Sequence, residues 1–195
     1  MEMDLPHGGD GQLALALVST IGHDGAGGIS DDFETSGGVA RWISEYCPGL
    51  APKGLELGLP DTVRAIRQAA RALFAMTVRP APPSRADAKR LMPDGEAVAL
   101  LTGAVAALEP TYTYGVEGNR VFTDRATDLT RADVVIPGLL AISVLDFLAG
   151  PNVTELRSCQ APRCVRYFLK HHGRQTWCKE SCGNRARVAR HAARN

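Results

Sequence analysis

The residues best suited to chemistry are four cysteines near the C-terminal end, which stand in two close pairs. Four residues separate Cys159 from Cys164, three separate Cys178 from Cys182, and thirteen lie between the pairs. Zn²⁺ takes four donors in tetrahedral geometry, and a tight turn can bring both thiolates of one pair onto the same ion. We therefore expect these four cysteines to bind one structural zinc ion.

Two other uses of paired cysteines fit the sequence less well. Disulfides require an oxidising compartment, whereas residues 1–8 are acidic and Gly-rich and lack the basic and apolar regions of a signal peptide. A redox pair usually reads Cys-x-x-Cys, and neither spacing here matches it. We expect a cytoplasmic protein whose fifth cysteine, Cys47, packs as a small core hydrophobe.

Charge is distributed unequally along the chain. Residues 155–195 hold ten Lys and Arg against Glu155 and Glu180, which is +8, whereas residues 1–154 hold 12 Lys and Arg against 19 Asp and Glu, which is −7. Such an excess in a small segment is the electrostatic footprint of a nucleic-acid binder. Two alternatives remain: the cations stabilise the zinc thiolates, or the basic tail docks on the acidic N-terminal domain.

The segment around the cysteines predicts a small metal-binding module. Residues 160–163 form a turn within the first pair. Two short strands are expected at 165–168 and 175–177, around the polar turn 171–174. A helix follows from about 179 to 194. Knuckle, hairpin and helix together make a treble-clef-like finger.

The expected C-terminal helix has two different faces at 100° per residue. Arg185 shares one face with Val188, Ala189 and Ala192, which we expect to pack on the hairpin. Together with Asn184, Arg185 is expected to support the metal centre. Five other basic residues are expected to contact phosphates of nucleic acid: Lys170, Arg174, Arg187, Arg190 and Arg194.

The sequence at these positions resembles a known family. The string Cys-Gly-Asn-Arg at residues 182–185, preceded by Trp177 and Cys178, is similar to the CGNR zinc finger. That finger usually follows a domain called ABATE, and the family is described as stress-induced transcription regulators, mainly in bacteria. The resemblance implies zinc as cofactor and DNA as partner.

The N-terminal part resembles ABATE more loosely. The similarity rests on residues 13–20 and 37–43, although Ala16 and Ser19 stand where the family often has Asp and Asn. We therefore divide the chain into three parts: a flexible tail (1–10), an ABATE-like domain (11–151) and a CGNR-type zinc finger (152–195).

Apolar periodicity predicts a mostly helical N-terminal domain with one β-hairpin, so the expected fold class is α+β. Helices are expected at 61–79, 84–91, 95–108 and 133–149, and the hairpin at 111–123. In the first of these helices, Arg64, Arg67 and Arg71 line one face. The last is interrupted by Pro137 and Asp146 and is expected to be too short to span a membrane.

Signals for catalysis are weak. The glycine-rich segment 22–28 matches no phosphate-binding loop or dinucleotide fingerprint, His23 and Asp24 within it fit a polar loop, and His7 lies in the tail. We expect no catalytic residues and no enzyme, but a zinc-dependent, DNA-binding transcription regulator away from membranes. Its N-terminal domain would sense a small molecule, form a homodimer or contact another protein. The alternative is a non-catalytic adaptor whose finger binds protein or RNA.

Overall fold

The computed structural model describes residues 11–50, 58–88, 91–109, 111–126 and 131–194. The expected tail, with His7, lies outside the described residues. Within them, helices dominate and the strands form three separate two-stranded antiparallel sheets. This arrangement confirms the α+β fold class, with a mostly helical N-terminal part followed by a small cysteine-rich module.

The helices, in chain order, are α1 (Gln12–Val18), α2 (Ser36–Tyr46), α3 (Leu59–Thr77), α4 (Asp94–Ala106), α5 (Ala132–Ala149) and α6 (Glu180–Ala192). The strands are β1 (Ile21–His23), β2 (Ile29–Asp31), β3 (Thr111–Glu117), β4 (Arg120–Ala126), β5 (Leu156–Ser158) and β6 (Tyr167–Leu169). Short 3₁₀ turns are η2 (Pro48–Leu50), η3 (Arg85–Asp87) and η4 (Pro151–Glu155). The helices expected at 95–108 and 133–149 are thus found as α4 and α5.

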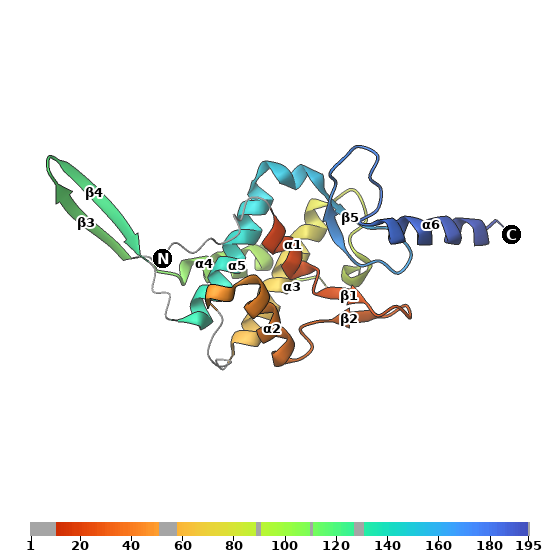
Figure 1. Cartoon of the computed structure of the whole chain (residues 1–195), viewed down its shortest axis with the longest axis horizontal. Coiled ribbons are helices and arrows are strands. Elements are labelled where there is room, and N and C mark those ends of the chain that lie inside the picture. Colours follow the sequence, from red (N-terminus) through yellow and green to blue (C-terminus); the bar gives the residue numbers. More distant parts are fainter. Residues whose placement is uncertain (1–10, 51–57, 89–90, 110, 127–130, 195) are drawn as a thin grey trace.

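Helix α3 forms the centre of the N-terminal domain. Its apolar residues recur at three- and four-residue spacing, so Val63, Ile66 and Phe74 share one fully buried face. The helix packs against α1, α4 and α5, and Figure 1 shows it near the middle of the molecule. The helix expected at 61–79 is confirmed, with a slightly earlier start.

Helix α5 is apolar around most of its circumference. By length and composition its 18 residues suffice to cross a bilayer, contrary to our expectation. In the structure, however, α5 packs against α1, α3 and α4, and Ile136, Leu140 and Phe147 are fully buried there. A helix that is hydrophobic all round is typical of a domain core as well as of a membrane span. Its packing makes α5 a core helix.

The helix expected at 84–91 is wrong in the described residues. Among the described residues of this stretch only η3 is helical, and Leu91 and Met92, which follow, lie outside any helix. The Ser84 side chain caps this turn by accepting a hydrogen bond from the backbone N–H of Ala86, and Asp87 points inward to Arg71 in α3. The buried ion pair therefore holds the chain in a turn that a longer helix would not allow.

The glycine-rich segment contains the end of strand β1, with His23, and the expected polar loop 24–28, which joins β1 to β2 in a β-hairpin. Strands β1 and β2 pair with Gly22 opposite Ser30. At the tip, Oδ1 of Asp24 accepts hydrogen bonds from the backbone N–H groups of Ala26, Gly27 and Gly28 at 2.8–3.0 Å. This carboxylate organises the turn, a role that short polar side chains commonly take.

The hairpin expected at 111–123 is present as β3–β4 and projects from the body of the molecule (Figure 1). Its register places Val116 opposite Val121. Those two side chains and Tyr114 are at least 70% exposed. The hairpin therefore presents apolar surface to solvent at the end of the molecule away from α6.

The strand pairing expected within the finger is wrong. Strand β6 pairs with β5, with Ser158 opposite Tyr167, and not with residues 175–177. Leu156 and Tyr167 are buried and belong to the core of the N-terminal domain. Burial of these two side chains favours the β5–β6 pair, whereas Gln175 closes the following turn by accepting from the backbone N–H of His171. The first half of the finger is thus built into the N-terminal domain.

Candidate metal centre and nucleic-acid interface

The four paired cysteines converge on one point. Their sulfur atoms all lie within 4.8 Å of one another; Cys178 Sγ is 3.4 Å from that of Cys182 and 3.7 Å from that of Cys164. Tetrahedral geometry with Zn–S bonds of about 2.3 Å requires sulfur atoms about 3.8 Å apart. The donor set and spacing therefore fit Zn²⁺: the expected cofactor is confirmed, and the four cysteines are able to coordinate it.

Three local structures hold these ligands. The knuckle between the first pair closes through a backbone hydrogen bond from Cys164 to Ala161, with Arg163 at a φ of 63°. Cys182 lies in the first turn of α6, and Cys178 just before it. Phe168 and Trp177 pack around the sulfur atoms. This small apolar shell excludes water from the thiolates, and it accounts for the burial of three of the four ligands.

The sulfur atoms also tune one another's acidity. Hydrogen bonds from Cys159 first, and then from Cys178, lower the pKa of Cys164 well below that of an ordinary thiol. By contrast, burial raises the pKa of Cys47 to about 11, and this side chain is 2% exposed in the main core. Cys164 is therefore a ready thiolate ligand, whereas Cys47 remains an apolar core thiol, as expected.

The Cys-Gly-Asn-Arg string has a physical explanation at each position after the ligand Cys182. A Cβ atom on Gly183 would stand 3.1 Å from Cδ1 of Trp177, so glycine makes room for that ring. The side-chain oxygen of Asn184 accepts a hydrogen bond from Arg187. Arg185 Nη2 donates to Cys182 Sγ at 3.1 Å. A cation at a zinc thiolate offsets the negative charge of the four-cysteine centre.

A groove of about 560 Å³ lies beside the metal centre, between the turn after β6 and the first turns of α6. Basic and imidazole side chains dominate its wall: His171, His172, Arg174, Lys179 and Arg187. Glu180 is the one carboxylate among the lining residues. The structure thus brings Arg174 and Arg187 together with His171 and His172 of the expected polar turn, and it adds Lys179, which sequence reasoning missed. Their spacing around the turn became interpretable only once its path was known.

The groove continues into a basic stripe along α6. Residues 187, 191 and 194 follow at three- and four-residue spacing, and Arg190 lies beside them. Among the described residues no ion pair joins an arginine of α6 to a carboxylate, and the helix points away from the acidic domain (Figure 1). Lys170 lies apart, half-buried at the end of β6, where its backbone N–H bonds to Glu155.

The opposite face of α6 contradicts our expectation. Val188 is 69% exposed, and Ala189 and Ala192 are also exposed, because the helix leaves the body after Ala186. Val188 and Ala189 instead line an open recess of about 380 Å³ with Pro162, and Arg163, Asn184 and Arg185 complete its wall, mainly with apolar atoms. The buried residues of α6 are Cys182 and Ala186 instead, and no hairpin lies where the expected face would pack.

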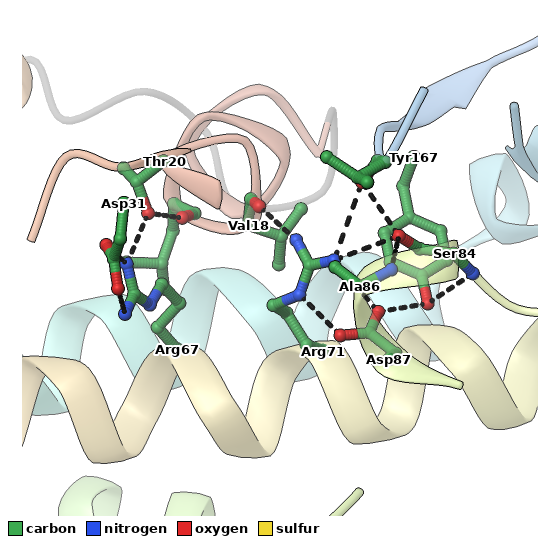
Figure 2. Close-up of polar contacts among 11 residues, drawn as sticks. Val18, Thr20, Asp31, Arg67, Arg71, Ser84, Ala86, Asp87 and Tyr167 are labelled. Carbon is green, nitrogen blue, oxygen red and sulfur yellow. Dashed lines mark hydrogen bonds and ion pairs between the residues drawn. The ribbon is translucent and has the colours of Figure 1, made fainter. Parts of the chain in front are cut away.

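Two buried arginines of α3 form polar networks, as Figure 2 shows, and Arg71 also reaches the finger by donating to the backbone carbonyl of Val165 at 3.5 Å. Arg67 pairs with Asp31 on β2. Arg71 pairs with Asp87 and also donates to the backbone carbonyl of Val18. The i, i+3, i+7 spacing of basic residues on this helix was the available signal, but the sequence did not indicate their burial.

The β1–β2 hairpin reaches the metal centre from the N-terminal domain. Nε2 of His23 lies 3.4 Å from Nη1 of Arg185, and the backbone carbonyl of Gly25 accepts from Arg163 at 3.4 Å. His23, expected in a polar loop, therefore contacts the arginine that donates to Cys182. Its position supports the finger rather than a catalytic site.

Two family models match the chain. The CGNR zinc finger matches residues 155–195, and ABATE, described as "putative stress-induced transcription regulator", matches residues 11–151. Because the second match covers most of the chain, the protein belongs to the ABATE family and carries a CGNR zinc finger at its C-terminal end. A search of curated proteins found no match.

Proposed function

We propose that the protein is a zinc-dependent, DNA-binding transcription regulator of the cytoplasm. The observation that carries this proposal is the groove beside the metal centre, lined by Arg174, Lys179 and Arg187 and continued by the basic stripe of α6. Within the described part of the chain, no salt bridge joins these lysine and arginine side chains to a carboxylate. The family description, a transcription regulator, supports the same conclusion.

In this proposal phosphates and bases are contacted by different parts of one surface. Arg174, Arg187, Arg190 and Arg194 contact phosphates and fix the position of the duplex, with Lys170 at the margin. Bases are read from α6 or from the turn 171–174, because these are the protruding elements of the module. The zinc ion has no catalytic part: its role is to fix α6 to the knuckle.

The N-terminal domain completes the proposal. We assign no catalytic activity to this domain, since the family is described as a regulator. We propose instead that it binds a small-molecule effector and forms a homodimer. For a homodimer, the exposed apolar side chains of Tyr114, Val116 and Val121 on β3–β4 offer the surface. Sedimentation velocity of the full chain and of Val116→Lys tests this point: a dimer that the substitution dissociates supports it, and a monomeric wild type contradicts it.

The experiment that tests DNA binding compares two charge reversals in the zinc-loaded full chain. Arg187→Glu alters the groove, whereas Arg120→Glu alters an equally exposed arginine on the β3–β4 hairpin. Fluorescence anisotropy with a random duplex at low salt should show at least tenfold weaker binding for Arg187→Glu and near wild-type binding for Arg120→Glu. Equal effects of the two reversals, or no binding by the wild type, contradict the proposal.

One observation favours the adaptor alternative, namely the apolar recess of Pro162, Val188 and Ala189. An exposed apolar patch of this kind is typical of protein contact surfaces. Val188→Asp separates the two functions, because it spoils the recess without changing the groove. If the finger is an adaptor, this substitution abolishes capture of a protein partner, and Arg187→Glu leaves that capture intact.

A further inference from the structure

Three polar side chains of α6 form a row on the face opposite its buried residues. Glu180, Asn184 and Arg187 are exposed and follow at four- and three-residue spacing, which places them above one another on one face of a helix. The buried residues Cys182 and Ala186 lie about 200–240° from Glu180 at roughly 100° per residue. All three side chains of the row also line the groove beside the metal centre. The row therefore faces the ligand that the groove binds.

Glu180 places a carboxylate in the wall of a basic groove. His171, Arg174, Lys179 and Arg187 also line this groove, and a carboxylate among them repels phosphates. In the ranges that the structure describes, no salt bridge joins Glu180 to a cation. Its two oxygen atoms are thus available to accept hydrogen bonds from a ligand that carries N–H groups.

Asn184, one turn further along α6, offers the complementary chemistry. Its side-chain oxygen accepts a hydrogen bond from Arg187, so the NH₂ group is the part of the amide that is left for a ligand. A guanidinium has five N–H donors, and Arg187 can therefore hold this oxygen and still contact a phosphate. The row presents an acceptor at Glu180 and a donor at Asn184, with Cβ atoms about 5–6 Å apart.

An acceptor beside a donor matches the major-groove edge of a C·G base pair. Cytosine presents its N4 amino group there, and guanine presents the O6 and N7 acceptors. A carboxylate accepts from cytosine N4, and an amide NH₂ donates to guanine O6 or N7. The N6 amino group of adenine fits less well, because it lies between two acceptors, adenine N7 and thymine O4, which repel a carboxylate.

We propose that Glu180 and Asn184 read one C·G base pair of duplex DNA, with Glu180 selecting the cytosine. A major groove about 12 Å wide admits a helix, and the N-terminal residues of a recognition helix are the ones that contact base edges. Helix α6 extends away from the body, so it is placed to enter such a groove (Figure 1). This inference rests on the proposed function: the cations supply affinity, and these two residues choose the sequence.

The test compares the zinc-loaded full chain with its Glu180→Gln variant on a library of duplexes with a randomised centre. Bound duplexes are sequenced, and total binding is measured by fluorescence anisotropy. The wild type should prefer a C·G pair at one position. Glu180→Gln should reduce that preference at least fivefold, since a single wrong base pair typically costs about that much or more in affinity. Its total binding to the library should be at least as tight as wild type, because a carboxylate that repels phosphates is gone.

Two further variants make the test specific. Asn184→Ala should reduce the preference at the same position, because both residues read one base pair. Glu117→Gln on the exposed β3–β4 hairpin should leave the preference unchanged. Zinc content and hydrogen-exchange protection of α6 show that each variant is folded. If Glu180 served only to stabilise the first turn of α6, through the helix dipole, its loss would weaken binding to all duplexes alike.

The outcomes separate this inference from the proposed function. Binding with an unchanged preference in Glu180→Gln, or with the two variants of α6 acting at different positions, overturns the inference and leaves DNA binding standing. A preference for any other base pair at the position that Glu180 controls overturns it as well. A wild type that binds no duplex at low salt overturns both.

Discussion

The two halves of the zinc finger differ in what surrounds them. The first half, β5 and β6, lies against the N-terminal domain, with Leu156 and Tyr167 buried in that domain's core. The second half, α6, has Cys182 and Ala186 as its only buried residues in the described part and extends away from the body (Figure 1). Both halves contribute ligands to the same metal centre.

The comparison indicates that the two halves of the zinc finger have different roles. The inner half is fixed by apolar burial and by the Arg71–Asp87 network, so it shares the stability of the N-terminal domain. The outer half has almost no packing of its own, and a helix of 13 residues is marginal in isolation. Zinc is therefore what attaches an exposed, basic helix to a rigid body.

Loss of the metal should give the largest effect. Cys182→Ser removes the ligand that α6 contributes, and structural zinc contributes about 10–16 kcal/mol in finger peptides. We expect the purified variant to lack zinc and α6 to lose hydrogen-exchange protection, while α3 and α5 remain protected. Elemental analysis and hydrogen exchange measure both points. A variant with one zinc per chain and a protected α6 would contradict the division between the halves.

The next largest effect is expected when one large apolar residue is truncated in each half and the free energies of unfolding are compared. Tyr167→Ala empties a buried position and should cost about 3–5 kcal/mol, as large aromatic truncations do in cores. Val188→Ala on α6 removes exposed atoms and should change the free energy of unfolding by less than about 0.5 kcal/mol. Urea unfolding of the zinc-loaded protein compares them. Similar costs at the two positions would show that α6 packs on the body.

A smaller contrast is expected between two arginines of α6. Arg185→Ala removes the hydrogen bond to Cys182 Sγ, a charged interaction worth about 1.5–3 kcal/mol, and should speed zinc transfer to a chelator. Arg187→Ala removes only an exposed contact with Asn184 and should leave zinc transfer near the wild-type rate. The reverse order of rates would mean that the roles of the two arginines are exchanged.

The smallest expected effect is a loss of stability at acidic pH. Burial alone raises the pKa of Asp31, but the hydrogen bond from Arg67 and the backbone N–H of Phe33 lower it overall. A lowered folded pKa means stability that is present above the unfolded value of about 4 and is lost as pH falls below it. We expect the β1–β2 region to lose stability at acidic pH, and Asp31→Asn should remove that part of the pH dependence of the free energy of unfolding. If the free energy of unfolding of Asp31→Asn depends on pH as it does in the wild type, this expectation is contradicted.

The sequence was informative where chemistry is local. The cysteine spacing predicted the metal centre, and the apolar periodicity around Val63 and Ile66 predicted α3. The hairpin at 111–123 followed from strand propensity on both sides of Gly118, whose φ of 59° suits glycine. In each case the signal lies within one short stretch of chain, so no knowledge of distant neighbours was needed.

The errors arose where distant residues decide the outcome. Tyr167 pairs with β5 and enters the N-terminal core, which its own neighbours in sequence do not reveal. Whether Val188 on α6 meets a packing surface depends on the path of residues 171–177, which the sequence of the helix does not reveal. The contact between His23 and Arg185 joins residues that are 162 positions apart.

The salt dependence of DNA binding tests the central claim, that the outer half of the finger presents its cations to phosphates. Each neutralised phosphate adds about 0.9 to the magnitude of the log–log slope. If all five expected residues make contact, the zinc-loaded full chain should give a slope of about −4 to −5. Arg190→Ala should lower its magnitude by about one on every duplex. A slope near zero, or one unchanged by Arg190→Ala, would contradict the account.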